Sequence, residues 1–97
     1  PGTDEFTEVF ETAVRMFPDD TIANLNAANA AMRRGDLTSA KRYLAKADDS
    51  PEAVYARGAL AIRQKDYDSA RRYLNEAKSL GLEQAGITLE QLEKGRR

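Results

Sequence analysis

Two arginines, Arg33 and Arg63, lie thirty residues apart, and Asn29 precedes the first of them by four residues. Residues four apart share one face of a helix, so Asn29 and Arg33 would present their polar groups together. A planar guanidinium binds a carboxylate through paired hydrogen bonds, and an asparagine amide can hold the polar groups of a peptide backbone. Asn29, Arg33 and Arg63 are therefore candidate binding residues, and their chemistry suits a carboxylate.

The composition disfavours catalysis. The chain has 97 residues and contains no histidine and no cysteine, so the usual general base, thiolate nucleophile and soft metal ligands are missing. The acidic pairs Asp19-Asp20 and Asp48-Asp49 lie at expected helix junctions, where turn and capping roles account for them. The glycines are scattered and form no phosphate-binding loop. We expect no enzyme activity, no catalytic residue, no metal and no cofactor.

Charge and hydropathy narrow the partners. There are 15 Lys and Arg against 16 Asp and Glu, a formal net charge of −1. That balance gives no overall attraction to nucleic acid or to an anionic membrane. No apolar run approaches the roughly 20 residues that span a bilayer, so we expect no direct membrane insertion. The chain begins PGTDEF without methionine, and we interpret it as a piece of a longer protein.

The elements that must position these residues are helices. Good helix formers dominate, and no sustained apolar–polar alternation predicts a strand. The first helix ends at Pro18, and its residues at helical spacing predict an apolar stripe. The stripe consists of Phe6, Val9, Phe10, Ala13, Val14 and Phe17.

Cap and turn residues divide the rest of the chain. The second helix covers about 21–34 and ends before Gly35, which suits the left-handed conformation that follows a helix. Asp36, Ser50 and Asp66 are natural caps for three further helices. These helices are expected over 37–48, 51–65 and 67–79. A sixth helix lies within 82–94 and begins at residue 82 or, from a Thr88 capping box, at residue 88.

The chain repeats itself. GDLTSAKRYLAKA (35–47) and KDYDSARRYLNEA (65–77) agree at seven of thirteen positions, thirty residues apart. A repeated helix pair cannot bury its apolar face alone and must stack on a neighbouring pair. Ala40 and Ala70 are the expected points of close packing between helices.

These repeats resemble tetratricopeptide repeats. The family's small residues, bulky pair and late alanine are matched in both copies, by Ala28, Ala40, Tyr43-Leu44 and Ala47, and by Gly58, Ala70, Tyr73-Leu74 and Ala77. The chain departs from the family in its spacing of thirty instead of about 34 residues. It also has Asn24 and Ala31 where the family has large aromatic residues.

The resemblance implies an all-α fold, a short superhelix of stacked antiparallel helix hairpins with five to six helices. We expect a single domain over 1–97. In it, 1–20 is the second half of a first repeat, 21–50 and 51–80 are repeats, and 81–97 is a C-terminal capping helix.

In such stacks the first helices of the repeats line a concave groove that holds an extended peptide, so the resemblance implies a protein or peptide partner. Counted by register, the groove lined by helices 21–34 and 51–65 consists of Leu25, Asn29, Met32, Arg33, Tyr55, Ala59, Ile62 and Arg63. Tyr55 would supply flat apolar area and a hydroxyl. Asn29, Arg33 and Arg63 resemble part of the family's carboxylate clamp, whose lysines have no match here.

Two other functions stay open. One is a purely structural scaffold that packs against other domains of the parent chain. The other is an RNA-binding helical repeat, because Lys41-Arg42 and Arg71-Arg72 recur in register. These pairs belong to second helices, which lie mainly on the convex side, and no exposed aromatic is interleaved for base stacking. We therefore expect no nucleic-acid partner.

A second resemblance concerns location. The chain is similar to C-terminal repeat segments of outer-membrane-protein-A-like envelope proteins of anaerobic gut bacteria. That resemblance implies a bacterial cell envelope location on the periplasmic side; without it, the expectation is cytoplasmic.

Overall fold

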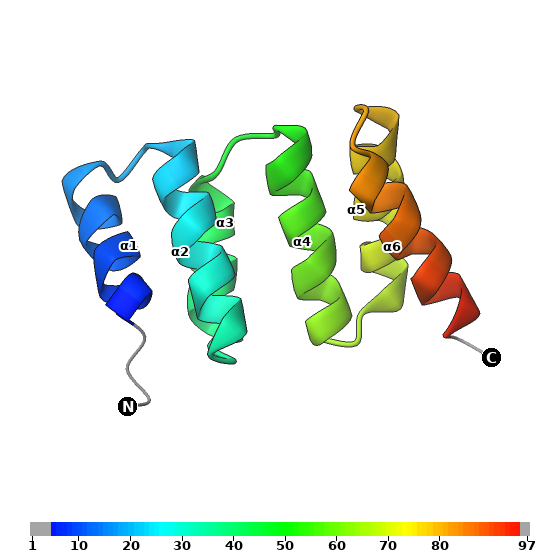
Figure 1. Ribbon diagram of the computed structural model, residues 1–97, viewed down its shortest axis with the longest axis horizontal. Helices are drawn as coiled ribbons and strands as arrows, with labels where there is room; N and C mark the ends of the chain where they lie inside the picture. The colour runs from blue at the N-terminus through cyan, green and yellow to red at the C-terminus, as the bar shows by residue number, and fades with distance from the viewer. Residues whose placement is uncertain (1–4, 96–97) are drawn as a thin grey trace. The chain divides into compact units, whose positions relative to one another are not determined.

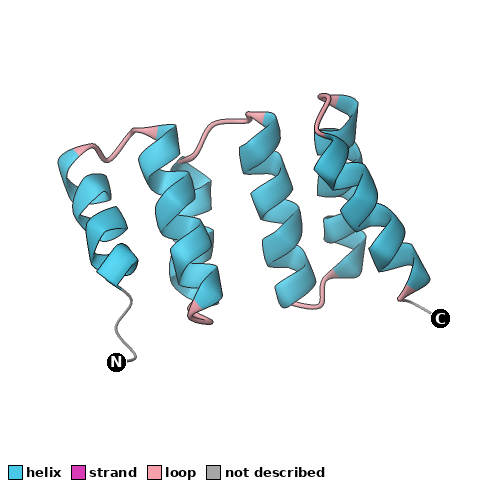
Figure 2. Cartoon of the chain, viewed as in Figure 1, coloured by secondary structure: helices cyan, strands magenta, loops and turns pink. Residues whose placement is uncertain are grey.

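The computed structural model describes the backbone of residues 5–95 and the side chains of residues 8–95. Within this range the chain forms six helices joined by short loops and contains no strand, as Figure 2 shows. The helices are α1 (Glu5–Met16), α2 (Thr21–Arg33), α3 (Leu37–Lys46), α4 (Pro51–Arg63), α5 (Tyr67–Ser79) and α6 (Glu83–Lys94) (Figure 1). The predicted all-α fold class is confirmed.

The helices belong to two compact units. The first unit covers residues 1–48 and includes α1 to α3, and the second covers residues 49–97 and includes α4 to α6. In the first unit α2 packs against both α1 and α3, and in the second α5 packs against both α4 and α6. Each unit is therefore a helix hairpin with one further helix. The single domain over 1–97 stays a prediction.

The predicted caps of α3 and α5 are confirmed. Asp36 accepts a hydrogen bond from the backbone N–H of Ser39 at 3.1 Å, and Asp66 accepts one from Ser69 at 3.3 Å. Hydrogen bonds from the side chain and backbone of Ser39 lower the pKa of Asp36, and those of Ser69 lower the pKa of Asp66. A lowered pKa means that these caps stabilise the fold above the ordinary aspartate pKa. Their contribution is lost as the pH falls through the lowered value.

The turns before α3 and α5 require a left-handed backbone. Gly35 has φ +80°, as the sequence predicts, and Lys65 has φ +63° at the equivalent position of the second unit. A side chain in this conformation costs about 1–2 kcal/mol that glycine avoids. The second unit therefore keeps its turn in spite of local strain.

Small side chains fill the helix interfaces. Ala28 and Ala40 in the first unit and Ala70 in the second are 0% exposed. At Gly58, which corresponds to Ala28, an added Cβ would lie 3.1 Å from the side chain of Leu74. The predicted close packing at Ala40 and Ala70 is confirmed, and α4 is also tightly packed against α5 at Gly58.

Asn24 departs from the family pattern for a local reason. Its side chain is completely buried, and its Nδ2 donates hydrogen bonds of 2.9 Å to the carbonyls of Pro18 and Asp20. The amide thus fastens the turn between α1 and α2, a role that an aromatic ring cannot fill. The Oδ1 of Asn24 has no hydrogen-bond partner among the described residues.

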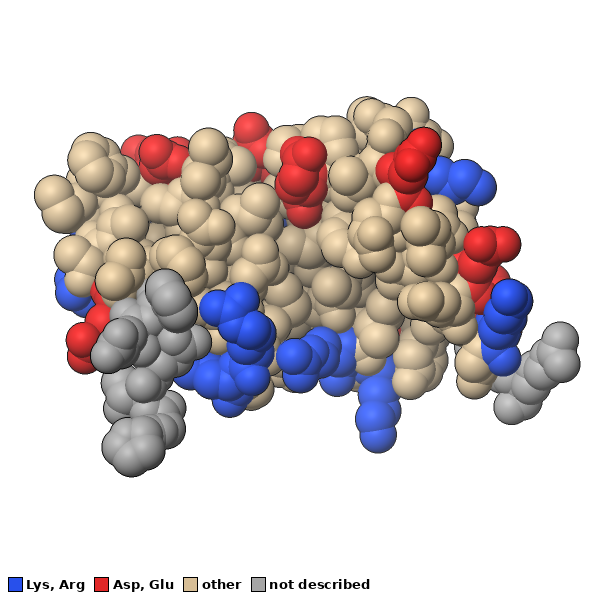
Figure 3. All heavy atoms as spheres, in the orientation of Figure 1, with Lys and Arg blue, Asp and Glu red and all other residues tan. Residues whose placement is uncertain are grey.

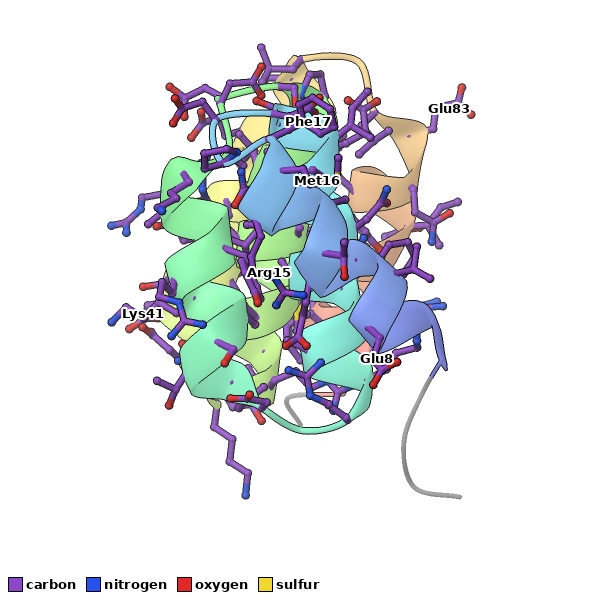
Figure 4. All side chains as sticks on the ribbon, turned by 90° about the vertical axis from the view of Figure 1, so that its left-hand side faces the viewer. Glu8, Arg15, Met16, Phe17, Lys41 and Glu83 are labelled. Carbon is purple, nitrogen blue, oxygen red and sulfur yellow. The ribbon has the colours of Figure 1, made fainter. Side chains whose placement is uncertain are left out.

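Two predictions about the ends of the chain are settled. Val9 and Phe17, expected on the buried stripe of α1, are 60% and 58% exposed, so that part of the prediction is wrong. The reason is that α1 packs on α2, so the opposite side of α1, which faces the viewer in Figure 4, is covered by no other described helix of this unit. Phe17 lies in the turn that follows α1, which ends at Met16. The side chain of Phe6 lies outside the described residues.

At the other end α6 begins at Glu83, so the predicted start at residue 82 is nearly right and Thr88 lies within the helix.

Replacement of Ala40 by leucine tests the close packing. Ala40→Leu forces a larger side chain into a filled interface, so the free energy of unfolding should fall by about 1–3 kcal/mol. Ala45→Leu is the matched control, because Ala45 is exposed on the same helix, and it should change stability by less than about 0.5 kcal/mol. Urea denaturation followed by circular dichroism measures both. Equal stability of the two variants would contradict the packing described.

Candidate functional site

On α2 the predicted site residues fall into two environments. Asn29 and Arg33 are exposed and lie one turn apart, and Leu25 is half-buried. Met32 is only 7% exposed and belongs to the core of the first unit. A partner that lies on α2 therefore meets a polar pair, Asn29 and Arg33, beside a partly buried leucine, and Met32 offers it little surface.

On α4 the second unit uses most of the predicted residues for its own packing. Tyr55 and Ile62 are half-buried and pack against a core that includes Val54 and Leu74. The Tyr55 hydroxyl forms a 2.9 Å hydrogen bond with Oγ1 of Thr88 on α6. The hydroxyl that the sequence assigned to a partner thus joins α4 to α6.

Of the two remaining predicted site residues on α4, Arg63 is the more exposed. Ala59 is half-buried, and Arg63 is exposed in the last turn of the helix. Arg63 therefore occupies on α4 the place that Arg33 occupies on α2, thirty residues earlier. The groove proposed to include both helices stays a prediction.

On both helices an acidic residue lies near the N-terminus and an arginine near the C-terminus, which is the arrangement that the helix dipole favours. Asp20 caps the start of α2 and Arg33 lies in its last turn, whereas α4 has Glu52 in its first turn and Arg63 in its last. Figure 3 shows blue side chains at the lower end of each of these helices and red ones near the upper end. Cations at a helix C-terminus are stabilised there by the partial negative charge of the last carbonyls.

Other kinds of site find no support in the described part of the chain. No group of three or more Asp or Glu side chains between residues 8 and 95 is placed to hold a metal ion. None of the six described helices has the length and apolar character to cross a membrane.

The model of the family described as tetratricopeptide repeat matches residues 8–48 and 39–85. Together these matches cover most of the chain. The chain belongs to the tetratricopeptide repeat family. Tetratricopeptide repeats generally mediate protein–protein interaction, and the family is typically non-enzymatic. The thirty-residue spacing and the missing aromatics therefore do not remove this chain from the family.

No curated protein matches the chain. The resemblance to outer-membrane-protein-A-like envelope proteins finds no support, and neither does the bacterial envelope location drawn from it.

Removal of the Tyr55 hydroxyl tests its structural role. Tyr55→Phe should lower the free energy of unfolding by about 0.5–1.5 kcal/mol, because it breaks the hydrogen bond between α4 and α6. Thr88→Val should have an effect of similar size. Tyr67→Phe serves as the control, since Tyr67 is 37% exposed. If Tyr55→Phe melts at the same temperature as the Tyr67→Phe control, the bond to Thr88 does not stabilise the second unit.

Proposed function

We propose that this chain is a non-catalytic protein-interaction module that binds a peptide segment through the exposed faces of α2 and α4. The observation that carries the proposal is the recurrence of an exposed arginine in the last turn of both first helices, Arg33 and Arg63. Family membership supports it, because tetratricopeptide domains generally bind proteins or peptides.

The chemistry of these faces favours an anionic ligand. A guanidinium forms bidentate hydrogen bonds with a carboxylate, and Asn29 places an amide one turn before Arg33. Leu25 on α2 and Ala59 and Ile62 on α4 are half-buried and can contribute apolar contact area. A peptide with a free C-terminal carboxylate or an acidic side chain is therefore the expected ligand.

A scaffold function is the second candidate, and a specific observation favours it. Met16, Phe17 and Ile22 in the first unit are 66%, 58% and 70% exposed. Large exposed apolar side chains, when they form a patch at a surface, are typical of contacts with another protein or domain. In this case the repeats would hold neighbouring domains and bind no peptide of their own.

A chemical-shift titration separates these functions. The whole chain is titrated with a set of acidic and free-carboxylate peptides at about 0.15 M salt, where attraction between exposed charges more than about 8 Å apart is largely screened. Saturable shifts are expected at Asn29, Arg33 and Arg63. The double variant Arg33→Ala, Arg63→Ala should lose at least about tenfold in affinity, the equivalent of 1.4 kcal/mol.

The matched control removes the same charge elsewhere. Lys41→Ala with Arg72→Ala takes two exposed cations from α3 and α5 and should leave the affinity unchanged. No saturable shift with any peptide would favour the scaffold. Shifts that survive the Arg33 and Arg63 substitutions would contradict the assignment of the ligand to these residues.

A further inference from the structure

A depression of about 360 Å³ lies within the first unit, and no residue of α2 lines it. It is lined by Glu11, Val14 and Arg15 from α1 and by Arg42, Tyr43 and Lys46 from α3. Figure 4 views α1 from outside and shows Arg15 between α1 and α3, with Lys41 on the far side of α3. We call this depression the α1–α3 pocket.

The lining of the α1–α3 pocket is strongly cationic. Three of its side chains, Arg15, Arg42 and Lys46, carry positive charge, and Glu11 carries the single negative charge, which leaves +2. Among residues 8–95 no carboxylate forms an ion pair with any of the three cations. Glu11 is paired instead with Arg34 at 3.4 Å. Positive charge without a carboxylate partner is therefore concentrated at a concave site.

Two of the cationic groups are held in place. The Arg15 guanidinium donates a 3.1 Å hydrogen bond to Oγ1 of Thr12, one turn earlier on α1. The Arg42 guanidinium lies over the ring of Tyr43, 5.3 Å from its centroid. Groups that are already ordered lose less conformational entropy when a ligand binds.

The second unit shows which of these features packing requires. Arg72 lies over Tyr73 at 5.5 Å, so the stacking of Arg42 is common to both repeats. Glu76 corresponds to Lys46, however, so the second repeat has a negative charge where the pocket has a cation. The repeat therefore folds without a cation at the position of Lys46, and packing does not account for the positive charge there.

We propose that the α1–α3 pocket binds a phosphoryl group carried by a segment of a partner protein. A phosphoserine or phosphothreonine carries a charge of about −1.5 to −2 at pH 7 and offers three acceptor oxygens, which matches a lining of +2 and three donors. A carboxylate has one charge and two oxygens and leaves the site incompletely neutralised. Val14 and Tyr43 supply the apolar wall for the residue that carries the phosphoryl group.

The test uses three short peptides with both termini blocked, so that none offers a free carboxylate to Arg33 or Arg63. They carry phosphoserine, glutamate or serine at one position and are otherwise identical. Titration of the whole chain at about 0.15 M salt should give saturable shifts of Arg15, Arg42 and Lys46 with the phosphoserine peptide. Affinity for the glutamate peptide should be at least about tenfold lower, and the serine peptide should not bind.

Variants assign the effect to the pocket. Arg15→Gln with Lys46→Gln should weaken phosphoserine binding at least about tenfold, whereas Arg72→Gln in the second unit should not change it. Equal binding of the glutamate peptide would overturn the preference for a phosphoryl group. Equal binding of inorganic phosphate would overturn the role of a protein segment. Shifts that persist in the double variant, or that centre on Arg71 and Arg72, would overturn the site.

Discussion

Within each unit, paired helices approach closely, and small residues lie at the centre of the contact. Ala40 and Ala70 are completely buried, and a Cβ at Gly58 would meet Leu74 at 3.1 Å. Close approach multiplies weak dispersion contacts, which is how a chain with few large apolar residues obtains a packed core. The rest of the structure depends on this contact, because it brings second helices onto first helices in one register.

The turn of each hairpin must bring the second helix back to this contact. The left-handed residue, Gly35 or Lys65, and the aspartate cap that follows it direct α3 and α5 back along their partners. Both units keep this turn, even though Lys65 is strained where Gly35 is not. With the interface filled by small residues, longer polar side chains remain on the outside. The two repeats can therefore share a core and differ in what their surfaces bind.

The surfaces of the two repeats differ in their electrostatic pairing. Arg71 in the second unit is neutralised by Asp68 and Glu93. The cations of the α1–α3 pocket have no such partner among the described residues. The arginines of α2 and α4, by contrast, recur at one position of the repeat. A recurring residue suits an extended ligand that meets several repeats, whereas a residue found in one repeat suits a single group.

Local signals in the sequence were sufficient for much of the fold. The caps at Asp36 and Asp66, the turn at Gly35 and the buried alanines depend on residues near one another, and the structure confirms them. The errors concern tertiary neighbours. Val9 and Phe17 fit an apolar stripe, but no described helix of their unit covers Val9, and Phe17 lies in the turn after α1.

The candidate site was harder to predict for the same reason. Counting by helical register correctly predicted that Asn29, Arg33 and Arg63 are exposed. It also predicted Met32 as a groove residue, although Met32 is buried. The bond between Tyr55 and Thr88 joins residues 33 positions apart, and no local pattern indicates it. The α1–α3 pocket likewise combines residues from two helices that are distant in sequence.

The most direct test of an interaction module that uses α2 and α4 is paramagnetic broadening by a spin-labelled ligand. The chain has no cysteine, so a nitroxide attached to a single cysteine of a bound acidic peptide stays on that peptide. We predict that the amide signals of Asn29, Arg33 and Arg63 broaden most strongly, and those of α3 and α5 least. Strongest broadening on α3 and α5, or uniform broadening over the whole chain, would contradict this assignment.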